Sequence, residues 1–516
     1  MTVKRLVLSI LTLVVVLLVG SSLLGSLGKP QITNRLQLYQ TNLVLTATAE
    51  PTDIDPSALQ AQVRQAIVGQ DPLKTALEQY EAVRKTATTD LATFQTSAAS
   101  AATSAAAVAP NPELAILIQQ QQQLIQQLDL QIGLLQAEQG DVAAAQTTWA
   151  QLLADEPLAT PGGTILVNPG VVQTATLLQG LWLDPPRLGA DGEAQLRAGL
   201  DGWFEGAALQ RWYTVTGETT ALEALQAQQG AIAQRTLLKL TVIGILPGIA
   251  AVTGIGFIIF LLAQRVMRGK EALLTLATDA PWETPWDWEI IWQVLIVGFF
   301  FMGQIVVPFV LGTLGSAFLV GGSSRSRAIY TLIYYLLMAT AGLLVLFFSV
   351  RPYRPLAAPW FRYRPVASFL LWGIGGYLTA LPLMLGVSLL NQQFWQGQGG
   401  SNPLLQIVLE ENDPVALGLF LFTAAVAAPI FEETLFRGFL LPSLTRYMPA
   451  AGAIALSSLV FAIAHLSLSE VLPLTVLGSM LGFVYWRSRN LLAPILLHSL
   501  WNSVTMIGLF ILGSGH

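Results

Sequence analysis

Apolar stretches at both ends of the chain enclose a long region of mixed polar and apolar positions. The first stretch covers about residues 6–24, directly after Lys4 and Arg5, and roughly 19 apolar residues are enough to cross the hydrocarbon core of a bilayer. From about residue 237 onward, apolar segments follow one another closely. With the first stretch, they predict eight or nine membrane helices, the later ones near residues 237–263, 288–312, 328–350, 366–390, 414–440, 451–468, 471–486 and 491–513.

The first apolar stretch ends in SSLLGSLG, which has small residues but lacks an A-x-A cleavage site. This favours an uncleaved membrane anchor, residues 1–27, over a cleaved signal peptide. In either case the segment that follows is expected to cross the membrane.

Residues 28–235 are rich in Ala, Gln, Leu and Thr and contain no long apolar span. The segment LQAEQGDVAAAQTTWAQLL resembles a tetratricopeptide hairpin, and a second candidate hairpin turns at Gly217. Two matches do not establish a repeat array, so an irregular helical domain with some coiled-coil character stays an equal alternative. Residues 157–186 are rich in Pro and Gly and predict a loop.

These patterns predict an all-α protein, a polytopic membrane bundle that carries a helical, extracytoplasmic, tetratricopeptide-like N-terminal domain. Four parts are expected: the anchor at 1–27, the helical domain at 28–235, additional membrane helices at 236–365, and a C-terminal core at 366–516.

Basic residues in short loops set the expected orientation. Lys4 and Arg5 place the N-terminus in the cytoplasm and the helical domain outside. Arg325 and Arg327 are the exception, because they fall on the predicted outer side, as does the acidic loop 391–413. The loops predicted to face inward carry Arg265, Arg268, Lys270, Arg351, Arg354, Arg362, Arg364, Arg446, Arg487 and Arg489. A multi-pass protein of a bacterial-type plasma membrane is expected, with a thylakoid membrane as the alternative.

Composition agrees with a membrane protein. Charged residues make up 11% of the 516 and hydrophobic residues 53%, with a mean hydropathy of +0.58, against about 25% charged in soluble domains. A net charge of −5 gives no reason to expect nucleic acid as a partner. The absence of cysteine excludes disulfides, thiolate metal sites and a cysteine nucleophile. Of three histidines, His465 and His498 lie within apolar segments.

Three charged residues lie inside one apolar segment: Glu432, Glu433 and Arg437. Burying such groups in a membrane is costly, so they usually pair or line a cavity. Glu433 and Arg437 are four residues apart, which favours an ion pair along a helix, and Glu432 points about 100° away from Glu433. The plain structural alternative is a buried ion pair that holds helices together.

The polar residues of the next spans fall at similar depth. Glu432 and His465 lie at comparable distances from the turn near residues 447–449, and Phe461 shares a face with His465. His498 and Asn502 are four apart and share a face of the last span. We therefore expect one polar site within the bundle.

A Glu and a His that converge on one water can deprotonate it for attack on a carbonyl. His498 and Asn502 can donate hydrogen bonds to the resulting oxyanion. Two His and a Glu also form a zinc ligand set, but the H-E-x-x-H spacing is absent and Asn is a poor ligand. A metal-free, glutamate-activated water is favoured, with no cofactor required and zinc as the alternative.

Three motifs resemble those of the CPBP family, the CAAX protease and bacteriocin-processing membrane peptidases. EETLFR at 432–437 resembles EExxxR, FAIAH at 461–465 resembles FxxxH, and HSLWN at 498–502 resembles HxxxN. The resemblance covers about residues 366–513 and leaves 28–235 outside the family pattern.

This resemblance implies a helical intramembrane bundle that acts as an endopeptidase in or beside the membrane. Glu432 and His465 would activate water, His498 and Asn502 would stabilise the oxyanion, and Glu433 with Arg437 would support them. The expected partners are a membrane-associated protein or peptide substrate and the lipid bilayer, with protein partners also expected on 28–235. The alternatives are a non-enzymatic scaffold or immunity-type protein, and a carrier, although no inverted repeats are found.

Overall fold

The computed structural model describes residues 2–49, 65, 67–103, 112–154, 159–160, 163–164, 168–189, 191–276, 282–319, 323–357 and 360–514. The architecture is all-α, as predicted, with one minor addition. Two two-residue strands, β1 (Ala159–Thr160) and β2 (Gly163–Thr164), pair antiparallel with Ala159 opposite Thr164.

The chain forms two compact units. The membrane unit comprises Met1–Gln31 and Leu246–Gly513, and the polar unit comprises Ile32–Ile245 with Ser514–His516. The four-part division by function expected from the sequence stays a prediction.

The polar unit is built from helices around a core that includes Trp149, Phe204 and Trp212. Its helices are α2 (Thr33–Thr46), α4 (Pro72–Thr103), α5 (Pro112–Glu138), α6 (Val142–Ala154), α7 (Pro169–Leu181), α8 (Gly192–Gly199), α9 (Gly202–Thr216), α10 (Thr219–Leu240) and the π-helical η1 (Thr241–Ile245).

Both helical hairpins predicted for this unit are present. The α5–α6 hairpin turns at Gly140, whose φ of +89° suits glycine, and the buried Trp149 of α6 packs where Gly133 of α5 leaves room. The α9–α10 hairpin turns at Gly217, the left-handed C-cap of α9.

The loop predicted at 157–186 is wrong in its second half, which forms α7. Asn168 caps this helix through its side chain, and Pro169 occupies its first turn, where no backbone donor is needed. The apolar residues that follow, including Leu177 and Leu178, are buried. Burial of this face explains the helix despite the flanking Pro and Gly residues.

The membrane unit consists of long apolar helices with shorter connecting ones. They are α1 (Val3–Ser26), α11 (Leu246–Arg268), η2 (Gly269–Glu271), α12 (Trp288–Gln293), η3 (Val294–Val306), α13 (Val307–Leu319), α14 (Ser324–Val350), η4 (Arg351–Tyr353), α15 (Ser368–Trp395), α16 (Pro403–Glu410), α17 (Pro414–Phe422), η5 (Thr423–Ala427), α18 (Ala428–Glu433), η6 (Thr434–Leu440), α19 (Leu441–Leu444), α20 (Ala450–Ile463), α21 (Leu468–Ser488) and α22 (Leu492–Gly513). Of these, η3, η5 and η6 are π-helical.

Eight helical segments of the described residues are long and apolar enough to cross a membrane. They match eight of the predicted spans, and the ninth corresponds to α20, which has only 14 residues. The protein is therefore an integral, multi-pass membrane protein. Its orientation and the particular membrane stay predictions.

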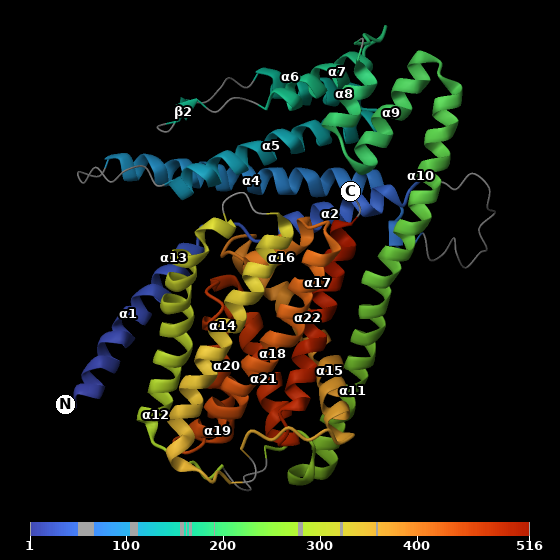
Figure 1. Ribbon diagram of the computed structural model, residues 1–516. Coiled ribbons are helices and arrows are strands. Elements are labelled where there is room, and N and C mark those ends of the chain that lie inside the picture. Colours follow the sequence, from blue (N-terminus) through green and yellow to red (C-terminus); the bar gives the residue numbers. More distant parts are fainter. Residues whose placement is uncertain are drawn as a thin grey trace. The chain divides into compact units, whose positions relative to one another are not determined.

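The long membrane helices run alongside one another in a bundle (Figure 1), and small residues allow some of them to approach closely. A Cβ at Gly254 of α11 would lie 1.9 Å from the Leu378 carbonyl of α15, and one at Gly376 of α15 would lie 2.6 Å from the Leu497 side chain of α22. Such close approaches are typical of helix packing in lipid, where apolar burial alone gives little selectivity.

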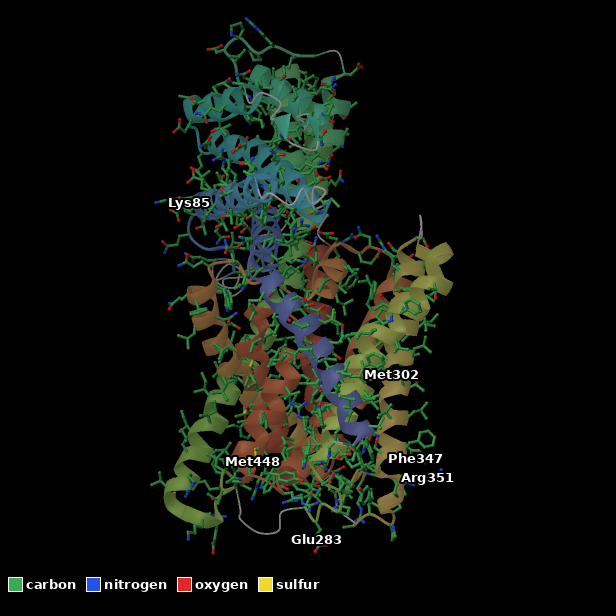
Figure 2. All side chains as sticks on the ribbon, turned by 90° about the vertical axis from the view of Figure 1, so that its left-hand side faces the viewer. Lys85, Glu283, Met302, Phe347, Arg351 and Met448 are labelled. Atoms are coloured by element: carbon green, nitrogen blue, oxygen red, sulfur yellow. The ribbon has the colours of Figure 1, made fainter. Side chains whose placement is uncertain are left out.

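The first helix belongs to this bundle. Arg5 and Lys4 both form ion pairs with Glu289 at the start of α12, and the Trp292 indole donates to the Thr12 hydroxyl at 2.7 Å. Figure 2 shows α1 running obliquely over the bundle, and it places Glu283, Arg351 and Met448 toward the same end of it. That end contains three of the loops predicted to face inward.

Candidate active site

The polar residues singled out from the sequence come from three separate helical segments. Glu432 and Glu433 end α18, and Arg437 lies in the π-helical η6 that continues it. His498 and Asn502 lie on α22, and His465 follows the end of α20. π-Helical turns inside α-helices often occur at functional sites, because they reorient side chains without breaking the helix.

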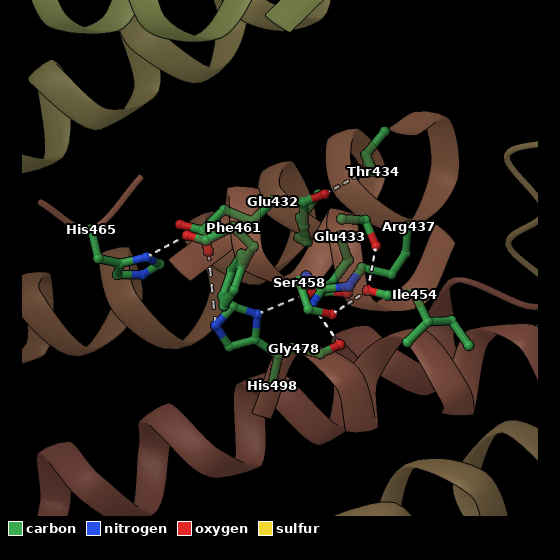
Figure 3. Close-up of polar contacts among 12 residues, drawn as sticks. Glu432, Glu433, Thr434, Arg437, Ile454, Ser458, Phe461, His465, Gly478 and His498 are labelled. Carbon is green, nitrogen blue, oxygen red and sulfur yellow. Dashed lines mark hydrogen bonds and ion pairs between the residues drawn. The ribbon is translucent and has the colours of Figure 1, made fainter. Parts of the chain in front are cut away.

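Glu433 is the centre of the buried contacts (Figure 3). Its Oε1 accepts a hydrogen bond from Arg437 Nη1 at 2.9 Å and lies 2.9 Å from His498 Nδ1. Glu433 and Arg437 are fully buried, and His498 is 4% exposed. The ion pair expected from the four-residue spacing is therefore present, and it also holds an imidazole.

Arg437 is anchored on two further sides. Its Nη2 donates to the Gly478 carbonyl of α21 at 3.0 Å, and its guanidinium lies 4.6 Å from the centre of the Phe461 ring. The same ring makes edge contacts with His465 and His498. Phe461 thus packs between the charged centre and both imidazoles, as its motif position suggested.

Glu432 has contacts of another kind. Its Oε1 accepts a hydrogen bond from the Tyr335 hydroxyl of α14 at 2.8 Å, and its Oε2 lies 3.9 Å from His498 Nε2. Its side chain is 14% exposed, whereas that of Glu433 is fully enclosed. The two neighbouring carboxylates therefore differ: Glu433 is paired with an arginine and enclosed, whereas Glu432 accepts from a tyrosine hydroxyl and is partly exposed.

His465 is placed differently from the expected helical position. The predicted span 451–468 is too long, because α20 ends at Ile463 and His465 lies in the turn beyond it. Leu466 follows with a φ of +59°, a strained value for a residue other than glycine. His465 Nδ1 lies 2.9 Å from the Phe461 carbonyl, and Figure 3 shows the ring pointing toward the Glu432 side of the site.

Asn502 shares the α22 face with His498, as predicted. Its Nδ2 donates to the Ala424 carbonyl in η5 at 2.7 Å. An amide nitrogen carries two hydrogens, so one remains for another acceptor. The contact also fixes the orientation of the amide relative to the helix that carries both glutamates.

Two participants were not anticipated from the sequence. Tyr335 lies in an apolar span next to a second tyrosine, and a hydroxyl at that depth needs a partner; this was the available signal. The Gly478 carbonyl had none, because its role depends only on how α21 packs against Arg437.

No group of three or more His, Asp or Glu side chains within the described ranges is arranged to hold a metal ion. Glu433 Oε1 is engaged by Arg437 and His498, and Glu432 Oε2 lies 3.9 Å from His498 Nε2. The requirement for a cofactor stays a prediction, with zinc as the alternative.

By fold and site, the C-terminal bundle is of the class of polytopic membrane proteins that bury a polar, ionisable centre between helices. Residues 414–504 match the family model described as type II CAAX prenyl endopeptidase Rce1-like. Together with the relatives described next, this match confirms the resemblance of the C-terminal segment to the CPBP intramembrane proteases.

Two curated proteins are similar to this segment. The protein named "Putative membrane peptidase YdiL" of Bacillus subtilis (strain 168) is 28% identical over 138 residues, 27% of this chain and 55% of that protein. "Membrane-embedded CAAX protease MroQ" of Staphylococcus aureus (strain USA300) is 26% identical over 143 residues, 26% of this chain and 56% of that protein. The chain thus spans about half the length of the curated relatives it matches. No solved structure matches it significantly.

Proposed function

We propose that the C-terminal bundle is an intramembrane endopeptidase that hydrolyses peptide bonds in or beside the membrane with a water activated by Glu432. The observation that carries this proposal is the division of labour between the two carboxylates. Arg437 neutralises Glu433 at 2.9 Å, whereas Glu432 faces only neutral donors and His498. A carboxylate that is not held in a buried ion pair with an arginine is the better base.

The reaction is written as a hydrolysis. Glu432 takes a proton from water while the water oxygen attacks the peptide carbonyl carbon, and His465 shares this role as the family resemblance implies. The carbonyl oxygen becomes the oxyanion of a tetrahedral intermediate. That intermediate collapses as the C–N bond breaks, and the proton held by Glu432 passes to the leaving amine. No further reactant is required.

His498 and Asn502 supply the donors for the oxyanion in this proposal. The contact of His498 Nδ1 with Glu433 Oε1 turns the Nε2 edge of the ring toward Glu432 Oε2, 3.9 Å away, and Nε2 is the donor proposed for the oxyanion. The second amide hydrogen of Asn502 is the other donor. Removal of one such donor typically lowers the rate about 100-fold to 1,000-fold.

The substrate proposed is a membrane-associated protein or peptide, and prenylation is not assumed. The polar unit holds a cavity of about 720 Å³ lined by residues of α2, α9 and α10, among them Thr46, Trp203 and Gln229. This cavity favours a partner-binding role for that unit. Such a role fits both a protease and the alternative, a non-enzymatic scaffold or immunity-type protein.

The test is to map new protein N-termini in membranes of cells that express the wild type, Glu432→Gln or Glu433→Gln. We expect wild-type-dependent termini to disappear in Glu432→Gln, although that variant still accumulates in the membrane. Identical termini in Glu432→Gln and wild type would refute the assignment of the base. Cleavage that survives exhaustive chelation would argue against the zinc alternative, and a cellular effect unchanged in Glu432→Gln would support the scaffold.

A further inference from the structure

One contact in the site comes from outside the segment that matches the family. Tyr335 lies on α14, before the matched residues 414–504, and its hydroxyl donates to Glu432 Oε1 at 2.8 Å. Three motifs account for the other ionisable groups of the site, whereas this tyrosine belongs to none of them. An additional membrane helix therefore reaches the carboxylate that is proposed as the base.

The packing of α14 fixes the height of Tyr335. Near one end, Arg325 of α14 forms an ion pair with Asp413, the N-cap of α17, at 2.6 Å. Farther along, Gly342 allows close contact, since a Cβ there would lie 3.1 Å from the Phe431 ring. The Tyr335 ring itself meets Phe431 edge-on at 6.2 Å. Phe431 directly precedes Glu432, so the hydroxyl is held against the helix that carries the carboxylate.

The neighbouring tyrosine offers an internal comparison. Tyr334 is also a membrane tyrosine of α14, and its hydroxyl donates to the Gly303 carbonyl of η3 at 2.9 Å. Both hydroxyls are satisfied, as expected for tyrosines in an apolar setting. Of the two, only the Tyr335 hydroxyl donates to an ionisable group of the site.

We propose that Tyr335 is a positioning residue for Glu432, an inference that rests on the proposed function. Its hydroxyl occupies Oε1 and thereby turns Oε2 toward His498, so that one defined oxygen meets the attacking water. The tyrosine hydroxyl is a neutral donor, so it orients the carboxylate without forming an ion pair. Arg437 provides the opposite arrangement for Glu433, which is paired and buried.

The experiment compares Tyr335→Phe with Tyr334→Phe in the purified, full-length protein, using a substrate found by the N-terminus mapping. Each variant loses one hydroxyl from the same helix. We expect Tyr335→Phe to lower kcat about tenfold with KM changed less than twofold, because a hydrogen bond to a charged group is lost. Tyr334→Phe should match the wild type in both kcat and KM.

Two outcomes would overturn the proposal: a Tyr335→Phe protein with wild-type rates at every pH, or equal impairment in both tyrosine variants. Failure of the proposed function has a different signature, in which the wild type does not cleave or Glu432→Gln cleaves normally.

If the proposed function fails, a measurement that needs no substrate can still test the hydrogen bond between Tyr335 and Glu432. In thermal unfolding, Tyr335→Phe and Glu432→Leu should be non-additive, because each removes one side of the same hydrogen bond. Tyr334→Phe and Glu432→Leu should be additive. Additivity in the Tyr335 cycle would refute the proposal even if no substrate were known.

Discussion

Two ion pairs in this protein have the same spacing and opposite surroundings. In the polar unit, Glu193 and Arg197 are four residues apart on α8, 3.1 Å from each other, with side chains 42% and 48% exposed. In the membrane unit, Glu433 and Arg437 have the same order and spacing at 2.9 Å, and neither side chain is exposed. The sequence rule that predicts both contacts does not reveal how different their energetic roles are.

Water accounts for the difference. Around Glu193 and Arg197, solvent screens the charges and replaces a lost partner, so such pairs contribute only a few tenths of a kcal/mol, roughly. Around Glu433 and Arg437, a lost partner leaves an uncompensated charge in an apolar bundle. The buried pair is therefore better understood as a requirement for keeping both charges inside than as a source of stability.

The largest effect is expected from Arg437→Met, which leaves Glu433 with His498 as its partner. Breaking a buried pair from one side typically destabilises by about 3–5 kcal/mol. We expect strongly reduced accumulation in the membrane and a lower midpoint of thermal unfolding. Arg197→Met is the matched control and should change neither by more than a small amount. Equal behaviour of the two variants would contradict the comparison.

An intermediate effect is expected from Gly478→Ala, which leaves both charges in place. The added Cβ would lie 2.9 Å from the Ser458 Cβ and 3.1 Å from Arg437 Nη2, so the guanidinium or α20 must move. Overpacking of this kind typically costs about 1–3 kcal/mol. Gly508→Ala on α22 is the control, since nothing lies within 4 Å of that position. A thermal midpoint as high for Gly478→Ala as for Gly508→Ala would argue against close packing of the Arg437 guanidinium against Gly478.

The smallest effect concerns the exposed pair and its pH dependence. The Tyr213 hydroxyl, with a smaller contribution from Arg197, holds the pKa of Glu193 below its ordinary value of 4.5. A depressed folded-state pKa gives stability that is present above the unfolded value and is lost as the pH falls through the folded one. Glu193→Gln should therefore remove a small, acid-sensitive contribution, about 0.3–0.5 kcal/mol for an i,i+4 pair.

Hydrogen exchange of α8 and α9 in the intact protein measures this effect locally. The wild type should lose protection in these helices as the pH drops below about 4.5, after correction for the intrinsic pH dependence of exchange. The Glu193→Gln variant should have less protection of α8 and α9 at neutral pH, and it should lose less of that protection as the pH falls. An unchanged profile in the variant would show that the pair contributes nothing, which would sharpen the contrast with Arg437.

Local sequence patterns were enough to predict the contacts made within one element. Apolar length predicted the membrane helices, and the four-residue spacing predicted the pair of Glu433 and Arg437. The charge of Arg325, an exception to the expected loop pattern, is paired with Asp413, which had been predicted on the same side. In each case the signal is contained in a short stretch of chain or in the loop charges.

Contacts between elements were predicted less well. Equal heights on two ideal helices suggested Glu432 and His465 as neighbours, but α20 ends before His465, and the closest imidazole nitrogen described for Glu432 is that of His498. The ring of His498 lies between both glutamates, a position that depends on how α22 packs against α18. Tyr335 was missed for the same reason, because no spacing rule links α14 to that segment.

The π-helical turns on either side of the glutamates also bear on how relatives should be compared. A wide turn accommodates about one residue more than the α-helical turn it replaces, and both η5 and η6 lie within the matched segment. A relative with an ordinary α-helix at either place would reach the same geometry with one residue fewer. Its alignment with this chain should then show single-residue gaps inside membrane helices, at Thr423–Ala427 or Thr434–Leu440, where gaps are usually penalised most.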